Sequence, residues 1–118
     1  MGGLSDLIAQ AEARLADNSR EKNIIMSNIG ELEGEIAETT RFLAQKETER
    51  ATVQFARPRT AELETGLQRL NYDVETLRVT LKTLEGSKSA CLSKMRDLDV
   101  QLSGDRRVVE VCSKGGTL

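Results

Sequence analysis

The sequence predicts an all-α protein in which two long helices fold back on each other as an antiparallel coiled-coil hairpin. Three observations support this fold class. Apolar residues recur every seven positions in two long segments, and a single proline, Pro58, separates those segments. Aromatic residues make up only 3% of the chain, whereas charged residues of both signs make up 31%. Sustained heptads in such a composition are typical of coiled coils.

The first segment is predicted as a helix over residues 4–54, after a short tail at 1–3. With position a set at Ile8 and position d at Leu4, ten of fifteen a and d positions are apolar. We call the a and d positions of both segments the seam, because these positions face the partner helix in a coiled coil. Its central members in this segment are Ile25, Ile29, Leu32, Ile36 and Leu43.

The second segment is predicted as a helix over residues 60–112, followed by a tail at 113–118. Position a falls on Thr60 and position d on Leu63, and thirteen of sixteen seam positions are apolar. Repetition over seven heptads is a strong sign of a coiled coil. The central seam members here are Leu70, Val74, Leu77, Leu81, Leu84 and Leu98.

Residues 55–59 are predicted as the turn, because the two heptad series are out of step at Pro58. Proline lacks an amide hydrogen and restricts the residue before it, Arg57, to extended backbone. Pro58 would suit the first turn of the second helix. At the other end of the chain, Ser5 is expected to cap the first helix, with Asp6 in its first turn.

The two helices can pair as a hairpin or continue as one kinked parallel rod, and the near-equal arms favour the hairpin. In a hairpin the residue numbers of facing seam residues add to a constant. We expect a sum of 113. At this sum Lys22 faces Cys91, Lys88 faces Ile25 and Asp105 faces Ile8. An alignment one heptad away, with a sum of 120, is the alternative.

Five charged residues interrupt the seam. They either set the alignment and the partner number or extend their charged ends out to solvent, and we expect the second for the basic residues. Asp105 is expected to mark fraying of the helix end. The interrupting residues are Lys22, Lys46, Arg50, Lys88 and Asp105.

A hairpin of two helices buries little apolar surface for the chain that it orders. We therefore expect further helices to cover this chain, from its own copies or from other coiled-coil proteins.

Other candidate contact residues lie off the seam. Phe42, Phe55 and Tyr72 are candidate docking residues, since aromatic side chains anchor interfaces. Phe42 and Tyr72 are expected to lie close together, as a docking patch or as a local contact. Gly30 and Gly34 permit close approach of another helix or reflect tolerance of small residues in a long helix.

Cys91 and Cys112 fall on d positions and are expected to behave as small apolar residues. A redox role is the alternative. With no histidine and no Cys-x-x-Cys, the sequence predicts no metal site and no cofactor.

Several functional classes lack sequence support. A net charge of −2 predicts no nucleic-acid partner. No apolar run approaches the roughly 20 residues of a membrane span. The chain also lacks histidine and a glycine-rich phosphate loop, so we expect no enzymatic activity.

The region around the turn resembles the C-terminal coiled-coil part of tektins, the filament proteins of ciliary and flagellar doublet microtubules. The run from Ile36 to Glu47, with Phe42 at its centre, is similar to the tektin segment before the signature loop. Arg57-Pro58 falls where tektins have Arg-Pro, and Glu62-Leu63 is similar to the Glu-Leu of the same motif, one residue late. Arg59 stands where the family has asparagine, and the family's Cys-Arg-Asp is absent.

The resemblance implies a structural filament protein that stabilises doublet microtubules in the axoneme. Its implied partners are other coiled-coil proteins, tubulin and microtubule inner proteins, with contacts at Arg57, Pro58, Glu62 and Leu63. The alternative is a cytoplasmic coiled-coil tether or adaptor. A third class, the arm of a chromosome-maintenance protein, would need an ATPase head, for which the sequence has no phosphate loop.

Overall fold

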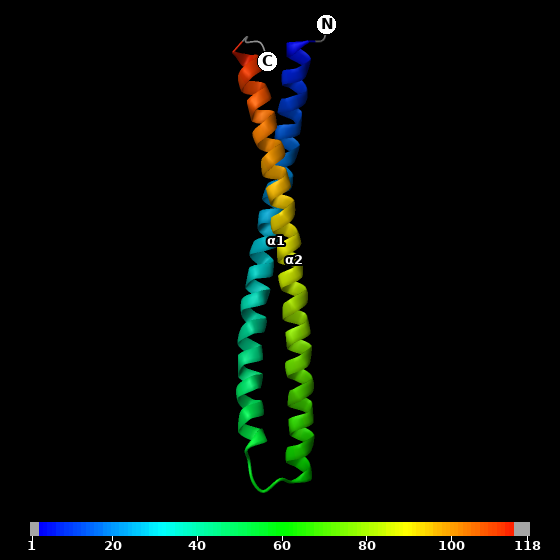
Figure 1. The fold of residues 1–118 in the computed structure, drawn as a ribbon, viewed down its shortest axis with the longest axis vertical. Coiled ribbons are helices and arrows are strands. Elements are labelled where there is room, and N and C mark those ends of the chain that lie inside the picture. Colours follow the sequence, from blue (N-terminus) through cyan, green and yellow to red (C-terminus); the bar gives the residue numbers. More distant parts are fainter. Residues whose placement is uncertain (1–2, 115–118) are drawn as a thin grey trace. The chain divides into compact units, whose positions relative to one another are not determined.

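The computed structural model describes residues 3–114, and these residues form two helices (Figure 1). Helix α1 spans Leu4–Gln54 (51 residues) and helix α2 spans Ala61–Ser113 (53 residues). The chain forms no strand between residues 3 and 114. The predicted all-α class with two helices and one turn is confirmed. Of the predicted tails, residues 1–2 and 115–118 lie outside the described residues.

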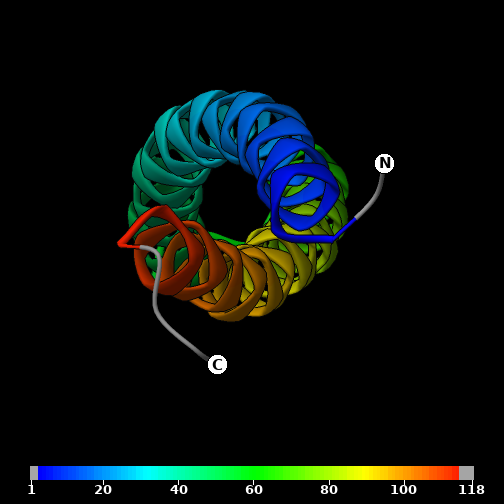
Figure 2. The same ribbon diagram turned by 90° about the horizontal axis from the view of Figure 1, so that it is seen from above.

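The helices contribute to two compact units, each an antiparallel pair of helical segments. Unit 1 joins the first part of α1, up to Gly30, with the part of α2 from Ser89 onward. Figure 2, which looks along the helices, shows these two segments of unit 1 winding around each other. Unit 2 is the continuous stretch Glu31–Lys88, which contains the turn and the helical segments on either side of it.

Burial follows the predicted seam in both units. Every seam position is buried or half-buried except Leu4 and Thr60, the first seam position of each segment. In unit 1 the buried apolar residues include Ile25, Ile29 and Leu98, which form one cluster. In unit 2 Leu70 and Val74 are buried. The sevenfold pattern thus identified the contacting face of each helix.

The start of α1 differs from the prediction. The amide of Leu7 donates to the carbonyl of Gly3 (3.1 Å), and Gly3 has a φ of 89°, which glycine adopts without strain. Ser5 therefore lies inside the first turn and is not the cap. Asp6 does lie in that turn, as expected, where its charge suits the helix dipole.

The start of α2 also differs, because Thr60 caps it. The Thr60 hydroxyl accepts a hydrogen bond from the amide of Leu63 at 3.1 Å, three residues into the helix. Side-chain capping by threonine satisfies an amide that has no partner within the helix. Pro58 belongs to the turn, where its bond to Arg57 is cis, and not to the first turn of α2.

The expected alignment of the two helices is wrong, and the alternative alignment is the observed one. In unit 1 Arg14 contacts Asp105 and Lys22 contacts Asp99, pairs whose numbers add to 119 and 121. In unit 2 Lys46 contacts Asp73, with a sum of 119, and Lys88 contacts Glu33, with a sum of 121. Seam residues facing each other therefore add to 120 in each unit.

Candidate association site

The apolar core of unit 1 is a single row of residues that runs along the seam. Ile25, Ile29 and Leu98 are 6%, 8% and 5% exposed, and half-buried Cys91 and Met95 pack against them. With a sum of 120, Ile25 faces Met95 and Ile29 faces Cys91. Cys91 thus serves as an apolar seam residue, as expected.

Charged seam residues in unit 1 extend out of the seam and reach the opposite helix. Lys22 faces Leu98, and its Nζ lies 2.6 Å from Oδ1 of Asp99, the residue after that leucine. Asp105 faces Leu15, and its Oδ1 accepts hydrogen bonds from both Nε and Nη2 of Arg14, each at 3.0 Å. The Asp105 side chain is only 13% exposed, so this residue is a paired seam position rather than a mark of fraying.

Unit 2 repeats the same arrangement on its own residues. Lys88 faces Leu32, and its Nζ lies 3.5 Å from Oε1 of Glu33. Lys46 faces Val74, and its Nζ lies 3.8 Å from Oδ2 of Asp73, with Glu49 at the same distance on its own helix. Four of the five charged seam residues therefore carry an ion pair to the opposite helix.

A simple rule relates these four pairs to the heptad. A lysine at position a pairs with the residue that follows its facing seam residue, as Lys22 does with Asp99. A charge at position d pairs with the residue that precedes its facing seam residue, as Asp105 does with Arg14. The charged ends lie in partly hydrated positions beside the seam, which avoids the cost of burying an unpaired charge.

These ion pairs explain why the chain takes a sum of 120 and not 113. A shift of seven residues keeps apolar residues facing apolar residues, so the heptad pattern alone does not decide. At a sum of 113 Lys22 would face Cys91, whose flanking residues Ala90 and Leu92 carry no charge. Lys46, Lys88 and Asp105 would likewise find no opposite charge beside the residues they face.

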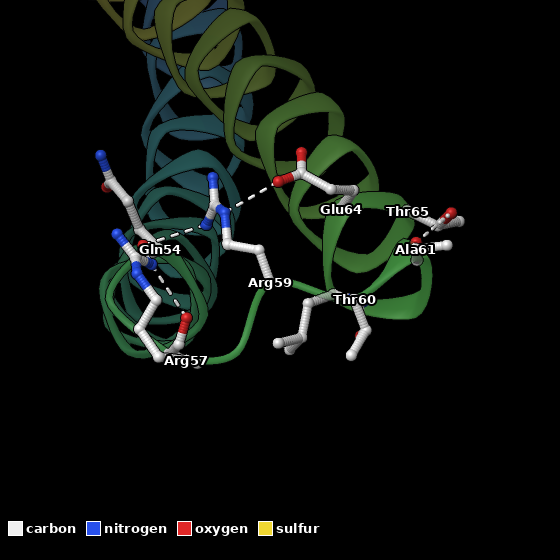
Figure 3. Close-up of polar contacts among 9 residues, drawn as sticks. Gln54, Arg57, Arg59, Thr60, Ala61, Glu64 and Thr65 are labelled. Atoms are coloured by element: carbon white, nitrogen blue, oxygen red, sulfur yellow. Dashed lines mark hydrogen bonds and ion pairs between the residues drawn. The ribbon is translucent and has the colours of Figure 1, made fainter.

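The turn carries a polar network of its own (Figure 3). Nη1 of Arg59 donates to the carbonyl of Gln54, the last residue of α1, at 3.0 Å, and its Nε lies 2.8 Å from Oε1 of Glu64. Arg59 thereby joins the end of α1 to the first turn of α2. Arg57 donates to the carbonyl of Ala56 at 2.9 Å. Charged donors at a helix end satisfy carbonyls that have no partner within the helix.

The predicted contact residues at the turn differ in exposure. Arg57, Pro58 and Glu62 are exposed, so their side chains are open to another molecule. Leu63 is half-buried, in line with its seam position.

The candidate docking aromatics are all exposed, but they do not form one patch. Phe42, Phe55 and Tyr72 are 45%, 75% and 72% exposed. Phe42 borders a shallow hollow with Lys46, Asp73, Thr76 and Leu77, and Tyr72 does not line it.

The alignment explains this separation. At a sum of 120 Phe42 is level with Arg78. Tyr72 lies six residues before Arg78, which is roughly 9 Å along the helix at about 1.5 Å per residue. The prediction that the rings of Phe42 and Tyr72 lie close together assumed a sum of 113. It is wrong because the observed sum is 120.

The cysteines lie on the seam, and the two glycines of α1 face open space. Both cysteines are free, and Cys112 is 4% exposed on the seam. A methyl group added at Gly30 or Gly34 would meet nothing within 4 Å. No side chain of the described chain therefore requires glycine at these two places.

Four acidic or basic partners of the seam charges are absent from the sequence-based candidates. They sit beside the seam, where coiled coils commonly carry charges, and only the alignment singles them out. These partners are Arg14, Glu33, Asp73 and Asp99.

Residues 3–114 contain no group of three or more His, Cys, Asp or Glu side chains placed to hold a metal ion. Neither described helix is apolar enough over a sufficient length to cross a membrane. The two helices and the turn present surfaces that are available for contact with other molecules.

Comparisons with known proteins add no family: the chain matches no family model, no curated protein and no solved structure.

Proposed function

We propose that this chain is a structural association module, a helical hairpin that pairs with further helices and has no catalytic role. The observation that carries the proposal is the thinness of its core. In unit 2 Leu70 and Val74 are the buried apolar residues, and the other apolar seam residues there are half-buried. Burial on this scale offsets little of the entropy lost on ordering long helices, so additional helices stabilise the fold.

Exposed apolar side chains support the same proposal. Ile24 and Met26 in unit 1 are 62% and 51% exposed, and Tyr72 and Val79 in unit 2 are 72% and 63% exposed. Scattered exposed apolar residues are ordinary on a protein surface. On a hairpin with so thin a core they are available to a neighbouring helix.

Sedimentation equilibrium combined with circular dichroism tests this function. We expect helicity and thermal stability of the pure chain to rise with its concentration, because association supplies the missing burial. A monomer that is fully helical and whose midpoint of unfolding is independent of concentration would contradict the proposal.

The tektin resemblance supports a narrower form of the proposal, a filament component that stabilises doublet microtubules in cilia or flagella. Here the exposed Arg57, Pro58 and Glu62 would contact tubulin, other coiled-coil proteins or microtubule inner proteins. Co-fractionation with axonemes that resist salt and detergent is the expected result. A diffuse cytoplasmic distribution would instead favour a tether or adaptor.

A further inference from the structure

Between Tyr72 and Gly86 the outer face of α2 carries none of the charges that a solvent-facing helix surface usually has, whereas Glu62 and Arg69 occupy the same face nearer the turn. This uncharged stretch lies opposite the seam, and we call it the α2 outer face. Its residues follow each other at helical spacing, are all exposed and are all uncharged: Tyr72, Thr76, Val79, Thr83 and Gly86. Tyr72 and Val79 keep 72% and 63% of their surface exposed. A helix that only faces water normally carries charged residues on this side.

The equivalent face of α1 in the same unit shows the ordinary pattern. Its heptad positions opposite the seam include Glu31, Glu38 and Arg41, all exposed and charged. The uncharged stretch is therefore a property of residues 72–86 of α2 and not of the unit as a whole.

One polar group on the α2 outer face already has a partner on its own helix. The Thr83 hydroxyl donates to the carbonyl of Val79 on its own helix at 3.0 Å. A tyrosine with two flexible torsions offers a large contact area at low entropic cost and is common at interfaces.

Two opposite charges border this face on one side. Glu75 and Lys82 occupy the same heptad position, one heptad apart. Their side chains therefore leave the helix on the same side, about two turns from each other. Glu75 has a local partner, Arg78, at 3.1 Å. Lys82 makes no ion pair within residues 3–114.

We propose that the α2 outer face binds a second copy of this chain, with the two α2 helices antiparallel about a twofold axis. The inference rests on the proposed function and names the surface and the partner for it. In this arrangement facing residues add to 155, so Tyr72 faces Thr83 of the second copy and Thr76 faces Val79. Glu75 of each copy then lies beside Lys82 of the other.

Charge complementarity selects both the partner and the alignment. A sum larger by seven brings the Lys82 side chains of the two copies together, and a sum smaller by seven brings the two Glu75 side chains together. Only the sum of 155 pairs each charge with its opposite, twice by symmetry. A surface that is complementary to itself about a twofold axis is what a homodimer contact requires.

Sedimentation equilibrium of the full chain under reducing conditions tests the proposal with charge exchanges. Wild type is expected to form a species of twice the 13.0 kDa chain mass. Glu75→Lys and Lys82→Glu each turn two attractive contacts into two repulsive ones, so each is expected to weaken association about tenfold. The double variant Glu75→Lys/Lys82→Glu restores both pairs and is expected to return association to near the wild-type level.

Glu38→Lys is the matched control, because it makes the same exchange on the outer face of α1 and should leave association unchanged. Circular dichroism confirms that each variant keeps its helices, since lysine and glutamate have similar helix propensities. If the single exchanges leave association unchanged, or if the double exchange fails to restore it, the proposed surface is wrong. Either result would leave the proposed function standing.

A wild-type chain that stays monomeric at all concentrations would overturn the proposed self-association. Its helicity then separates the two proposals. A partly unfolded monomer would still need further helices, as the proposed function states, whereas a stable, fully helical monomer would contradict both.

Discussion

Nζ of Lys22 lies 2.6 Å from Oδ1 of Asp99, across the seam of unit 1 and one residue beyond the leucine that Lys22 faces. This ion pair favours the observed alignment of the two helices, because a shift of seven residues would separate its charges. Its counterpart in unit 2, Lys88 with Glu33, has the same geometry.

Reversing the charge at Asp99 tests this pair. Asp99→Lys places two ammonium groups together, and we expect the free energy of unfolding to fall by about 1 kcal/mol. Lys22→Asp/Asp99→Lys should recover most of that loss in a double-mutant cycle followed by urea unfolding. Asp97→Lys, an exposed change two residues away, is the control and should cost little. Equal losses in the free energy of unfolding for Asp97→Lys and Asp99→Lys would show that the ion pair between Lys22 and Asp99 does not stabilise the fold.

Asp105 offers a second test, because its carboxylate is 13% exposed and accepts two hydrogen bonds from Arg14. Asp105→Asn keeps the shape but loses the charge, and we expect unfolding to become easier by about 1 kcal/mol. Asp105→Leu should instead stabilise the chain, since leucine packs against Leu15 while Arg14, half-exposed, returns to water. Chemical denaturation measures both. A neutral Asp105→Asn together with a destabilising Asp105→Leu would contradict this description of the site.

Much of this architecture was predictable from the heptads and Pro58, and the limits of the prediction have physical causes. Ile25, Ile29 and Leu98 were placed on the seam because burial repeats every seven residues, and all three are buried. The same repeat is unchanged by a shift of one heptad, so it could not choose between sums of 113 and 120. Asp99 and Glu33, which decide the choice, look like ordinary surface charges in the sequence.

The ends of the helices show a second limit. Ser5 has the right chemistry for a cap, but Gly3 reaches the positive φ that starts α1 earlier. Pro58 suggested a helix start, yet the hydroxyl of Thr60 makes the capping bond. Such competition is local and close in energy, so residue type alone does not settle it.

Thr60 provides a test at the turn. Thr60→Ala removes the hydroxyl that accepts from the Leu63 amide, and we expect a loss of about 1 kcal/mol in the free energy of unfolding. Thr60→Asp keeps an acceptor at the cap and should retain most of the stability. Thermal unfolding followed by circular dichroism compares the two variants. Equal stability of Thr60→Ala and wild type would show that another group starts α2.

The seam itself is tested by two valines of opposite exposure, since Val74 in unit 2 is fully buried and Val100 in unit 1 is 73% exposed. Val74→Ala should cost about 2 kcal/mol through lost burial and a residual cavity. Val100→Ala removes no buried contact, so its effect on the free energy of unfolding should stay within about 0.5 kcal/mol. Urea unfolding at one fixed chain concentration compares them. A reversed order would place the seam on the wrong face of α2.

The alignment of the helices is tested most directly by engineered disulfides in a chain whose two native cysteines are replaced by alanine. Ile36 and Leu84 face each other at a sum of 120, whereas Ile36 and Leu77 would face each other at 113. The two partners on α2 are about 10 Å apart, and a disulfide tolerates Cα separations only up to about 7 Å. We predict that the cysteine pair at 36 and 84 closes an intramolecular bridge on oxidation in dilute solution, while the pair at 36 and 77 stays reduced. A bridge between 36 and 77, with none between 36 and 84, would contradict the account.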